Sequence, residues 1–357
     1  MSLLTMNAKK IFSLVASTIK LFIIILLLNS NSRAEEKNIK SYSDDKGILA
    51  LMYHRFDENK YPSTNIQMDV FKQQIKIIRN LKYKFYNPKD LKKNFHNTKV
   101  EKKILITIDD AFSSFYKVAW PYLKEEKIPF ILFVSTEAIG KNGYMSWDQI
   151  KELEKENIAY IGNHSHTHDY LVDLKNSDFI NDINTASKIF IKNLGYNPIF
   201  FSYPFGEYSN FIKAHIAKNF EFSFGQHSGV IDVNKDRYEL PRFPINEKYG
   251  DLKRFQFLIN LQPLQYKALF PDEKYLDRNN PPNFSVEFFD EQKNLNNINC
   301  FSDEGNQWGK SNVDFNKNIL NINFREKFLF RRGRINCSLN DNGIWRWFGV
   351  QFSIKID

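Results

Sequence analysis

The stretch KILITIDDAFSSFYKVAWPYLKEEKIPFILFV, residues 103–134, carries the pattern that decides the fold. Residues 103–108 and 130–134 are short and almost wholly apolar, which is typical of strands buried on both faces. Between them, residues 115–126 place apolar side chains at helical spacing. A strand, a helix and a second strand in this order predict two parallel strands joined by a helix.

The same alternation extends on both sides of this stretch, from residue 45 to residue 262. Further strands are predicted at residues 47–53, 158–162 and 199–201, and further helices at residues 68–81, 147–156, 179–194 and 208–219. A repeated β/α pattern over roughly 215 residues fits a small α/β barrel of fewer than eight complete units better than a full-sized one.

The pattern changes after residue 262. Residues 272–282 are rich in Pro, Asp and Asn, and they predict a linker or an irregular entry to a second domain over residues 275–357. Beyond the linker lie four short runs: FSVEFF (284–289), ILNINF (319–324), FLFRR (328–332) and WRWFGVQFSI (345–354). Short alternating runs separated by Asn, Asp and Gly are typical of all-β domains, so we expect a small sandwich.

The N-terminal residues 1–34 have the pattern of a secretory signal peptide. Basic residues up to Lys20 precede the apolar run LFIIILLL (21–28), and the small residues Ser32 and Ala34 follow it. A retained anchor is the alternative, but the uninterrupted apolar part is too short to cross a bilayer. In both cases we expect the body of the protein to be exported, to the periplasm, the cell envelope or the outside.

Composition excludes several classes of protein. Of the 357 residues, 42% are hydrophobic and 25% charged, unlike a disordered, collagenous or polytopic membrane protein. The formal net charge of +9 permits a nucleic-acid partner, but export argues against one and favours an anionic envelope surface. In an oxidising compartment we expect Cys300 and Cys337 to form a disulfide, with two unpaired buried thiols as the alternative.

Four polar features follow predicted strands, at the end where barrels carry their active sites. Taken singly, each has a structural explanation: an aspartate pair caps a helix, and a Pro-Gly pair makes a turn. Together in one β/α domain they indicate an active site. They are His54 in LMYHRF, Asp109 and Asp110 in ITIDDAF, the histidines of GNHSHTH (162–168), and SYPFG (202–206).

The histidines have metal-ligand spacing. His164 and His168 are four residues apart, so on a helix or an extended loop both face the same way and can reach one metal ion. Asp110 would complete a His2Asp set, which leaves zinc an open position for water. His166 is expected to be a bystander or to support a ligand.

The three motifs ITIDDAF, GNHSHTH and FSYPFG resemble the central motifs of the NodB-homology polysaccharide deacetylases, carbohydrate esterase family 4. LMYHRF and LPRFPIN (240–246) are similar to the branch that includes biofilm poly-N-acetylglucosamine deacetylases. The resemblance covers residues 47–250 and implies a distorted (β/α)7 barrel over residues 45–262. It also implies a hydrolase that removes N-acetyl groups from an N-acetylhexosamine polysaccharide.

The resemblance implies a metal-assisted reaction. Asp110, His164 and His168 would bind a divalent ion, for which zinc is expected, and the ion would polarise the acetamide carbonyl and hold a water. Asp109 would act as general base on that water. The backbone N–H of Phe205 would bind the developing negative charge, so Phe in place of the commoner Tyr has no obvious cost.

The proton for the leaving amine is expected from His54, with His227 as the less favoured substitute. Two positions depart from the family pattern: Ala111 replaces the usual Gly, and Ser202 stands where many relatives carry Arg. The second change removes a group that tunes the base, so an ion pair from Arg242, or else Arg55, would have to replace it.

Alternatives to an N-deacetylase remain on sequence alone: a glycan-binding protein that has lost activity, or an O-deacetylase on the same barrel. In the C-terminal domain, Trp345 and Trp347 would either stack on sugar rings or belong to the core of the sandwich. The alternating pattern of WRWFGVQF favours the core.

Overall fold

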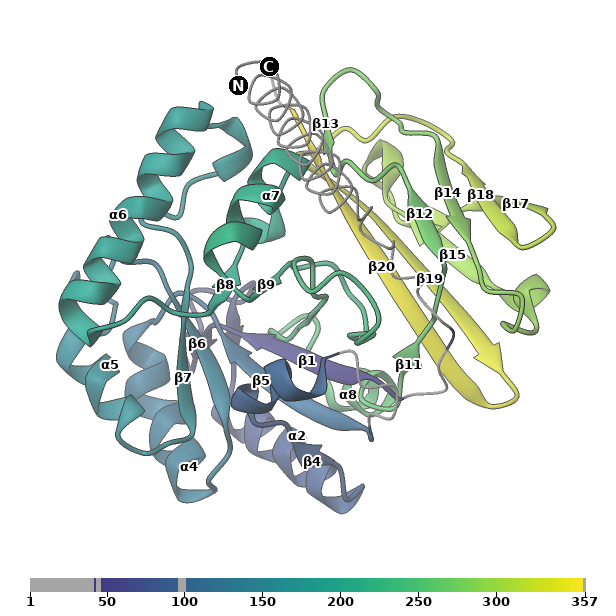
Figure 1. Cartoon of the computed structure of the whole chain (residues 1–357). Helices are drawn as coiled ribbons and strands as arrows, with labels where there is room; N and C mark the ends of the chain where they lie inside the picture. The colour runs from purple at the N-terminus through teal and green to yellow at the C-terminus, as the bar shows by residue number, and fades with distance from the viewer. Residues whose placement is uncertain (1–41, 43–45, 96–100, 356–357) are drawn as a thin grey trace, which may run out of the picture. The chain divides into compact units, whose positions relative to one another are not determined.

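A curled sheet of parallel strands forms the first part of the structure, a computed structural model that describes residue 42, residues 46–95 and residues 101–355 (Figure 1). The strand order is β10-β1-β5-β6-β7-β8-β9, and β4 also pairs with β5. The strands are β1 (Ile48–Tyr53), β4 (Lys84–Phe85), β5 (Lys103–Ile108), β6 (Phe130–Val134), β7 (Ala159–Asn163), β8 (Phe200–Ser202), β9 (Phe222–Phe224) and β10 (Phe243–Pro244).

Helices follow the strands and cover the outside of the curled sheet (Figure 1). Their apolar faces explain this position, since Phe71, Ile75 and Ile78 of α2 lie in one buried cluster with strand residues such as Leu51 and Ile106. The helices are α2 (Met68–Asn80), α3 (Leu91–Asn94), α4 (Trp120–Glu125), α5 (Trp147–Glu154), α6 (Asn176–Leu194), α7 (Asn210–Asn219) and α8 (Leu252–Leu258), with a π-helical turn, η2 (Phe115–Ala119), before α4. Short elements complete the region: β2 (Arg55–Phe56), β3 (Asn65–Ile66), η1 (Pro88–Asp90), η3 (Leu171–Asp173) and η4 (Pro204–Gly206).

The segment that leads into β10 closes the curled sheet. Leu240 forms a parallel bridge with Phe224 of β9, and β10 pairs with Leu51 and Met52 of β1. Arg242 lies between these two contacts and is fully buried. The parallel order and the covering helices confirm the predicted distorted (β/α)7 barrel.

Two sheets form the C-terminal region, as the predicted sandwich requires: one is antiparallel, and the other is mixed, because β11 and β13 pair in parallel with β20. They share a buried core that includes Val286, Leu320, Ile335 and Phe352. A disulfide joins Cys300 of β15 to Cys337 of β19, which are direct neighbours in the register. One sheet has the order β11-β20-β19-β15-β16 with β13 beside β20, and its strands are β11 (Gln262–Pro263), β13 (Tyr275–Leu276), β15 (Asn299–Ser302), β16 (Gly309–Lys310), β19 (Arg332–Asp341) and β20 (Ile344–Ile354). The other has the order β12-β14-β18-β17, formed by β12 (Ala268–Phe270), β14 (Phe284–Glu287), β17 (Asn312–Asn316) and β18 (Ile319–Asn323). Two 3-10 turns, η5 (Leu295–Asn297) and η6 (Glu304–Asn306), connect strands of this region.

Some local predictions were wrong. The run FLFRR is not a strand of its own, because β19 begins only at Arg332 and the preceding Leu329 and Phe330 are exposed. Trp345 and Trp347 do not belong to the sandwich core: they lie on the opposite face of β20, where Trp347 packs against the barrel core. That face is covered by the barrel, so alternation alone could not indicate which side is the core.

The part of the chain from residue 42 onward is one compact unit, and the domain limits 45–262 and 275–357 stay predictions. Within the predicted linker, β13 pairs in parallel with β20. The predicted signal peptide, residues 1–34, lies outside the described residues. Among the residues that are described, none of the helices combines the length and the apolar character that crossing a membrane requires.

Candidate active site

The predicted site residues come together at one end of the barrel. Asp109 and Asp110 directly follow β5, His164 directly follows β7, and Phe205 lies in η4, just after β8. Because the carboxyl ends of parallel strands meet at the same edge, these three sequence-distant motifs become neighbours.

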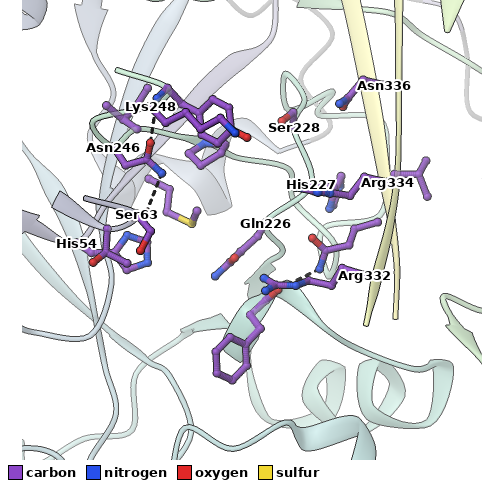
Figure 2. Close-up of a pocket in the computed structure, with 18 of the residues that line it drawn as sticks. His54, Ser63, Gln226, His227, Ser228, Asn246, Lys248, Arg332, Arg334 and Asn336 are labelled. Carbon is purple, nitrogen blue, oxygen red and sulfur yellow. Dashed lines mark hydrogen bonds between the residues drawn. The ribbon is translucent and has the colours of Figure 1, made fainter. Parts of the chain in front are cut away.

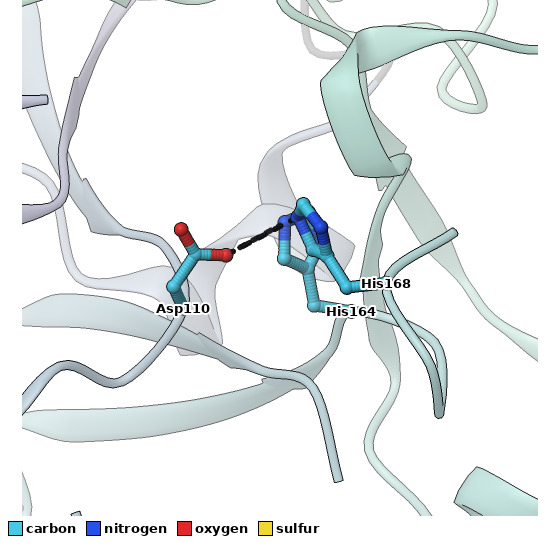
Figure 3. Close-up of side chains that lie close together, drawn as sticks. All are labelled: Asp110, His164 and His168. Carbon is cyan, nitrogen blue, oxygen red and sulfur yellow. Dashed lines mark ion pairs between the residues drawn. The ribbon is translucent and has the colours of Figure 1, made fainter. Parts of the chain in front are cut away.

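Asp110, His164 and His168 form a cluster in which both imidazole rings face one carboxylate (Figure 3). Asp110 Oδ1 lies 3.5 Å from His164 Nε2 and 3.3 Å from His168 Nε2. All three potential ligand atoms lie within 4.8 Å of one another. Two imidazole nitrogens and one carboxylate oxygen are ligands that zinc and several other divalent ions accept, so the cluster fits such an ion.

A hydrogen bond on the side of the ring away from the cluster sets the orientation of His164. Its Nδ1 donates to the backbone carbonyl of Ser202 at 2.7 Å, which leaves the lone pair of Nε2 directed at the cluster. Burial lowers the pKa of His164 to about 4, although the negative charge of Asp109 opposes this shift. The ring is therefore neutral at neutral pH, which is the form that binds a metal ion.

The loop that carries the histidines is curled rather than helical. Ser165 and His168 have positive φ angles, 69° and 59°. Two local hydrogen bonds hold this shape: Asn163 Oδ1 accepts from the backbone N–H of Ser165, and Ser165 Oγ accepts from that of His168. The spacing of the histidines predicted a helix or an extended loop; the segment is a loop, but it is curled rather than extended.

Asp182, a residue that the sequence analysis missed, holds the same loop from helix α6. Its carboxylate accepts from the backbone N–H of His166 at 2.8 Å and from both the N–H and the hydroxyl of Thr167, at 2.9 and 2.8 Å. His166 pairs with Thr136 at 2.8 Å, away from the cluster. The available signal was an acid on the buried face of α6, where helical spacing requires an apolar residue.

The motifs ITIDDAF and FSYPFG also contain residues with a strained backbone. Asp110, Ala111 and Phe205 have φ angles of 72°, 52° and 58°, in a region that side chains with a Cβ rarely occupy. This explains why Gly is usual at position 111, since Gly adopts a positive φ without cost, whereas Ala111 holds that conformation under strain. Non-glycine residues in such conformations concentrate at functional sites, where the surrounding structure holds them.

Asp109 and Arg242 form a fully buried ion pair directly below the cluster. Arg242 Nη1 donates to Asp109 Oδ1 at 2.7 Å, and Nη2 donates to Oδ2 at 2.9 Å. The remaining guanidinium hydrogens are bound by Thr107 Oγ1, Ser202 Oγ and the carbonyl of Gly225. Every donor of Arg242 is thus satisfied, as a buried charge requires.

The same ion pair explains why a small residue, Ser202, stands where many relatives carry Arg. The guanidinium of Arg242 contacts the hydroxyl of Ser202 at 2.8 Å and fills the space that a larger residue there would need. Arg55, the other candidate partner of Asp109, instead pairs with Glu58 at 2.8 Å and stacks on Phe112.

The arginine also sets the charge of Asp109. Burial raises the pKa of this carboxyl, but Arg242, followed by His164 and His54, outweighs the effect and the pKa falls to about 2. Asp109 is therefore ionised at neutral pH, and Oδ2 lies 4.0 Å from His164 Nε2, on the side of the cluster.

A cavity of about 810 Å³ opens above the cluster. It is lined by Asp110, His168 and Phe205 and by the two histidines considered as proton donors, His54 and His227. Figure 2 shows His54 with Ser63 on one side, and Arg332 with Asn336 from β19 on the other. Burial lowers the pKa of His227 to about 4, so its ring is neutral at neutral pH.

The C-terminal region supports the FSYPFG motif, which contains Phe205, through contacts that the sequence analysis missed. Gln351 of β20 donates from Nε2 to the backbone carbonyl of Phe205 at 3.0 Å. Arg331 bonds the buried carboxylate of Glu207 at 3.0 Å and stacks on Tyr170, whose ring stacks in turn on Phe205 at 4.1 Å. No motif signalled these residues, since the contacts depend on how the sheet packs on the barrel.

A barrel with a buried carboxylate beside a His2Asp cluster at its strand ends has the arrangement of a hydrolase active site. Comparison with known proteins names the kind of hydrolase: residues 96–224 match the family model described as polysaccharide deacetylase. Residues 96–224 thus form a polysaccharide deacetylase domain, and the match and the curated relatives indicate a deacetylase of the hydrolase class.

Characterised relatives and solved structures agree with this assignment. The chain is 25% identical over 266 residues to a poly-beta-1,6-N-acetyl-D-glucosamine N-deacetylase of Staphylococcus aureus (strain N315), covering 64% of this chain and 91% of the relative. The structure of IcaB from Ammonifex degensii matches with a TM-score of 0.52 at 25% identity, over 61% of this chain and 99% of that one. The Streptococcus pyogenes deacetylase PplD in complex with acetate shares the fold, with a TM-score of 0.55 at 22% identity, over 60% and 98%.

Proposed function

We propose that this protein is a metal-dependent hydrolase that removes N-acetyl groups from an N-acetylhexosamine polysaccharide. The observation that carries the proposal is the Asp110–His164–His168 cluster directly above the ionised, buried Asp109. The relatives named as poly-N-acetylglucosamine N-deacetylases make a polymer of N-acetylglucosamine the first substrate to test.

The cluster would hold a divalent ion, and its donor set makes zinc the first choice. When bound, such an ion supplies Lewis-acid polarisation of a carbonyl oxygen and lowers the pKa of a coordinated water. Asp109 is proposed as the general base, because it is ionised, held rigidly by Arg242 and directed at the cluster.

The other steps fall to residues around the cavity. The backbone N–H of Phe205 is proposed to donate to the oxygen on which negative charge develops, a role that its positive φ and the Gln351 contact would support by fixing the loop. His54 is proposed to protonate the leaving amine, since it lines the cavity. His227 is the weaker candidate, because its lowered pKa keeps the ring neutral at neutral pH, without the acidic proton of an imidazolium.

Export is proposed on two independent features. One is the signal-peptide pattern of residues 1–34, and the other is the Cys300–Cys337 disulfide, a bond that forms and persists in oxidising compartments. Within the exported protein, residues 45–262 are proposed as the deacetylase domain and residues 275–357 as the β-sandwich domain. The net charge of +9 is proposed to favour an anionic envelope surface.

The test is acetate release from an acetylated glucosamine oligomer, with and without chelator. We expect release that the chelator abolishes and that added zinc or cobalt restores. The Asp109→Asn variant should keep the metal but lose turnover, and His164→Ala should lose the metal. His166→Ala is the matched control, because that ring faces Thr136 and should keep both metal and activity. A wild type that releases no acetate with metal restored would refute the proposal.

Two alternatives have distinct outcomes in the same assay. An inactive glycan-binding protein would bind the oligomer without releasing acetate, although the presence of the base and all three ligands argues against it. An O-deacetylase would release acetate from O-acetylated but not from N-acetylated sugars.

A further inference from the structure

One face of the six-stranded sheet carries side chains that the proposed reaction does not use. Along β19, Arg334 and Asn336 alternate with Ile335 and Cys337, which are buried in the sandwich core. Because successive side chains of a strand point to opposite faces, the two polar residues lie on the face away from that core. Phe301 of β15 pairs directly with Asn336 in the register and therefore shares this face.

These side chains line the same cavity as the metal cluster. Phe301, Trp308, Arg334 and Asn336 are among its lining residues, together with Asp110. Phe301 and Trp308 are 43% and 46% exposed, so both rings are accessible to a ligand in the cavity. The cavity thus runs from the barrel site to an aromatic surface on the sheet.

The polar groups beside the rings are held in place. Arg334 bonds Asp303 at 2.7 Å through Nε and lies over the ring of Trp308, 5.3 Å from its centre. Arg332 projects from the same face of β19 and also lines the cavity. Fixed donors beside exposed rings are the groups that a sugar chain needs, since each sugar has an apolar ring face and an edge of hydroxyl groups.

The charge around the cavity restricts the ligand further. Among the described residues that line it, Asp110 is the one carboxylate, whereas Lys248, Arg254, Arg332 and Arg334 are cations. Arg334 and Arg332 are paired with Asp303 and Glu207, so the repulsion of a strand of protonated amino sugars would come from Lys248 and Arg254. A strand that still carries its N-acetyl groups would not be repelled.

We propose that Phe301, Trp308, Arg332, Arg334 and Asn336 form a second glycan subsite, which binds the N-acetylated polymer away from the sugar that reacts at Asp110. The inference rests on the proposed function and deepens it: the C-terminal sheet makes the enzyme select polymer over short oligomers. Nothing in the barrel motifs assigns this role, because the sheet residues lie beyond the matched residues 96–224.

The test compares a dimer and a hexamer of N-acetylglucosamine as substrates of the metal-loaded full chain. For the double variant Phe301→Ala/Trp308→Ala we expect kcat/KM for the hexamer to fall at least about tenfold, a difference of about 1.4 kcal/mol, while kcat/KM for the dimer stays unchanged. The matched control is Phe330→Ala, which removes an even more exposed ring of the same region that does not line the cavity. It should behave as wild type on both substrates.

An unchanged rate on the hexamer, or an equal loss on hexamer and dimer, would overturn the subsite. Binding of the hexamer, measured by calorimetry on the same variants, gives a readout that does not depend on turnover. If wild type releases no acetate but binds the hexamer and only the double variant loses binding, the proposed function fails and the subsite stands. If wild type binds no hexamer, the subsite fails.

Discussion

Two sides of the cavity are built in opposite ways. We call the strand ends of the barrel, with Asp109, Asp110 and His164, the floor, and the side formed by β19, β20 and the adjoining Arg331 the wall. On the floor, charged side chains from separate strand ends are buried and fully paired, as the Asp109–Arg242 pair illustrates. On the wall, single side chains such as Gln351 and Arg331 reach the site from another sheet. The comparison teaches that the reacting groups come from local motifs, whereas their support comes from packing between sheets. Changes on the floor should therefore cost more than changes on the wall.

The largest expected effect is on stability, from Arg242→Met. Removing one partner of a buried ion pair leaves Asp109 charged and without its compensation, which costs about 3–5 kcal/mol. The double variant Asp109→Asn/Arg242→Met should recover most of this loss, because no isolated charge remains. Urea unfolding of both variants checks the prediction, and a double variant as unstable as the single one would show that the loss is due to packing.

The next effect is on metal binding, from Asp182→Ala. Loss of the three hydrogen bonds from the His166–Thr167 segment should loosen the histidine loop and lower the affinity for zinc about 10–100-fold. The control is Asp178→Ala, an exposed acid on the same helix. Competitive titration with a zinc indicator measures both, and equal affinities would mean that the loop keeps its shape without Asp182.

The strands and the site residues could be predicted from the sequence, whereas the residues that support the site could not. The strands at Lys103–Ile108 and Phe130–Val134 have the predicted bounds, because their runs are mostly apolar and are bounded by polar residues or by Pro129. The residues of the site could be named because parallel strand ends meet at one edge. Asp182 left only a weak signal on its helix. Gln351 left none, since its contact depends on how β20 packs against the turn at Phe205, 146 residues earlier in the chain.

A third effect is a dependence of stability on pH. The folded-state pKa of Asp109 is lowered from 3.8 to about 2, so its ionised form stabilises the fold above pH 3.8. That contribution, about 2 kcal/mol, should be lost as the pH falls through about 2. Unfolding free energies at pH 5 and pH 2 should therefore differ more for wild type than for Asp109→Asn/Arg242→Met. Equal pH dependence of the two proteins would contradict the lowered pKa.

The smallest effect is expected on the wall, from Gln351→Leu. Loss of one hydrogen bond to the carbonyl of Phe205, about 1 kcal/mol, should lower kcat about fivefold and leave KM unchanged, because the change loosens the loop that holds the proposed oxyanion donor. Gln256→Leu, at an exposed position on α8, is the control. A rise in KM with kcat unchanged would assign Gln351 to substrate binding instead.

The central claim is that the Asp110–His164–His168 cluster binds the ion on which deacetylation depends. The most direct measurement is the rate of acetate release from the N-acetylglucosamine hexamer as zinc is added stepwise to the metal-free chain, with bound metal determined in the same samples. We predict a rate that rises in proportion to bound zinc and saturates at one ion per chain, with no rise for His164→Ala. A full rate in the metal-free chain, or the same titration curve for His164→Ala, would contradict the account.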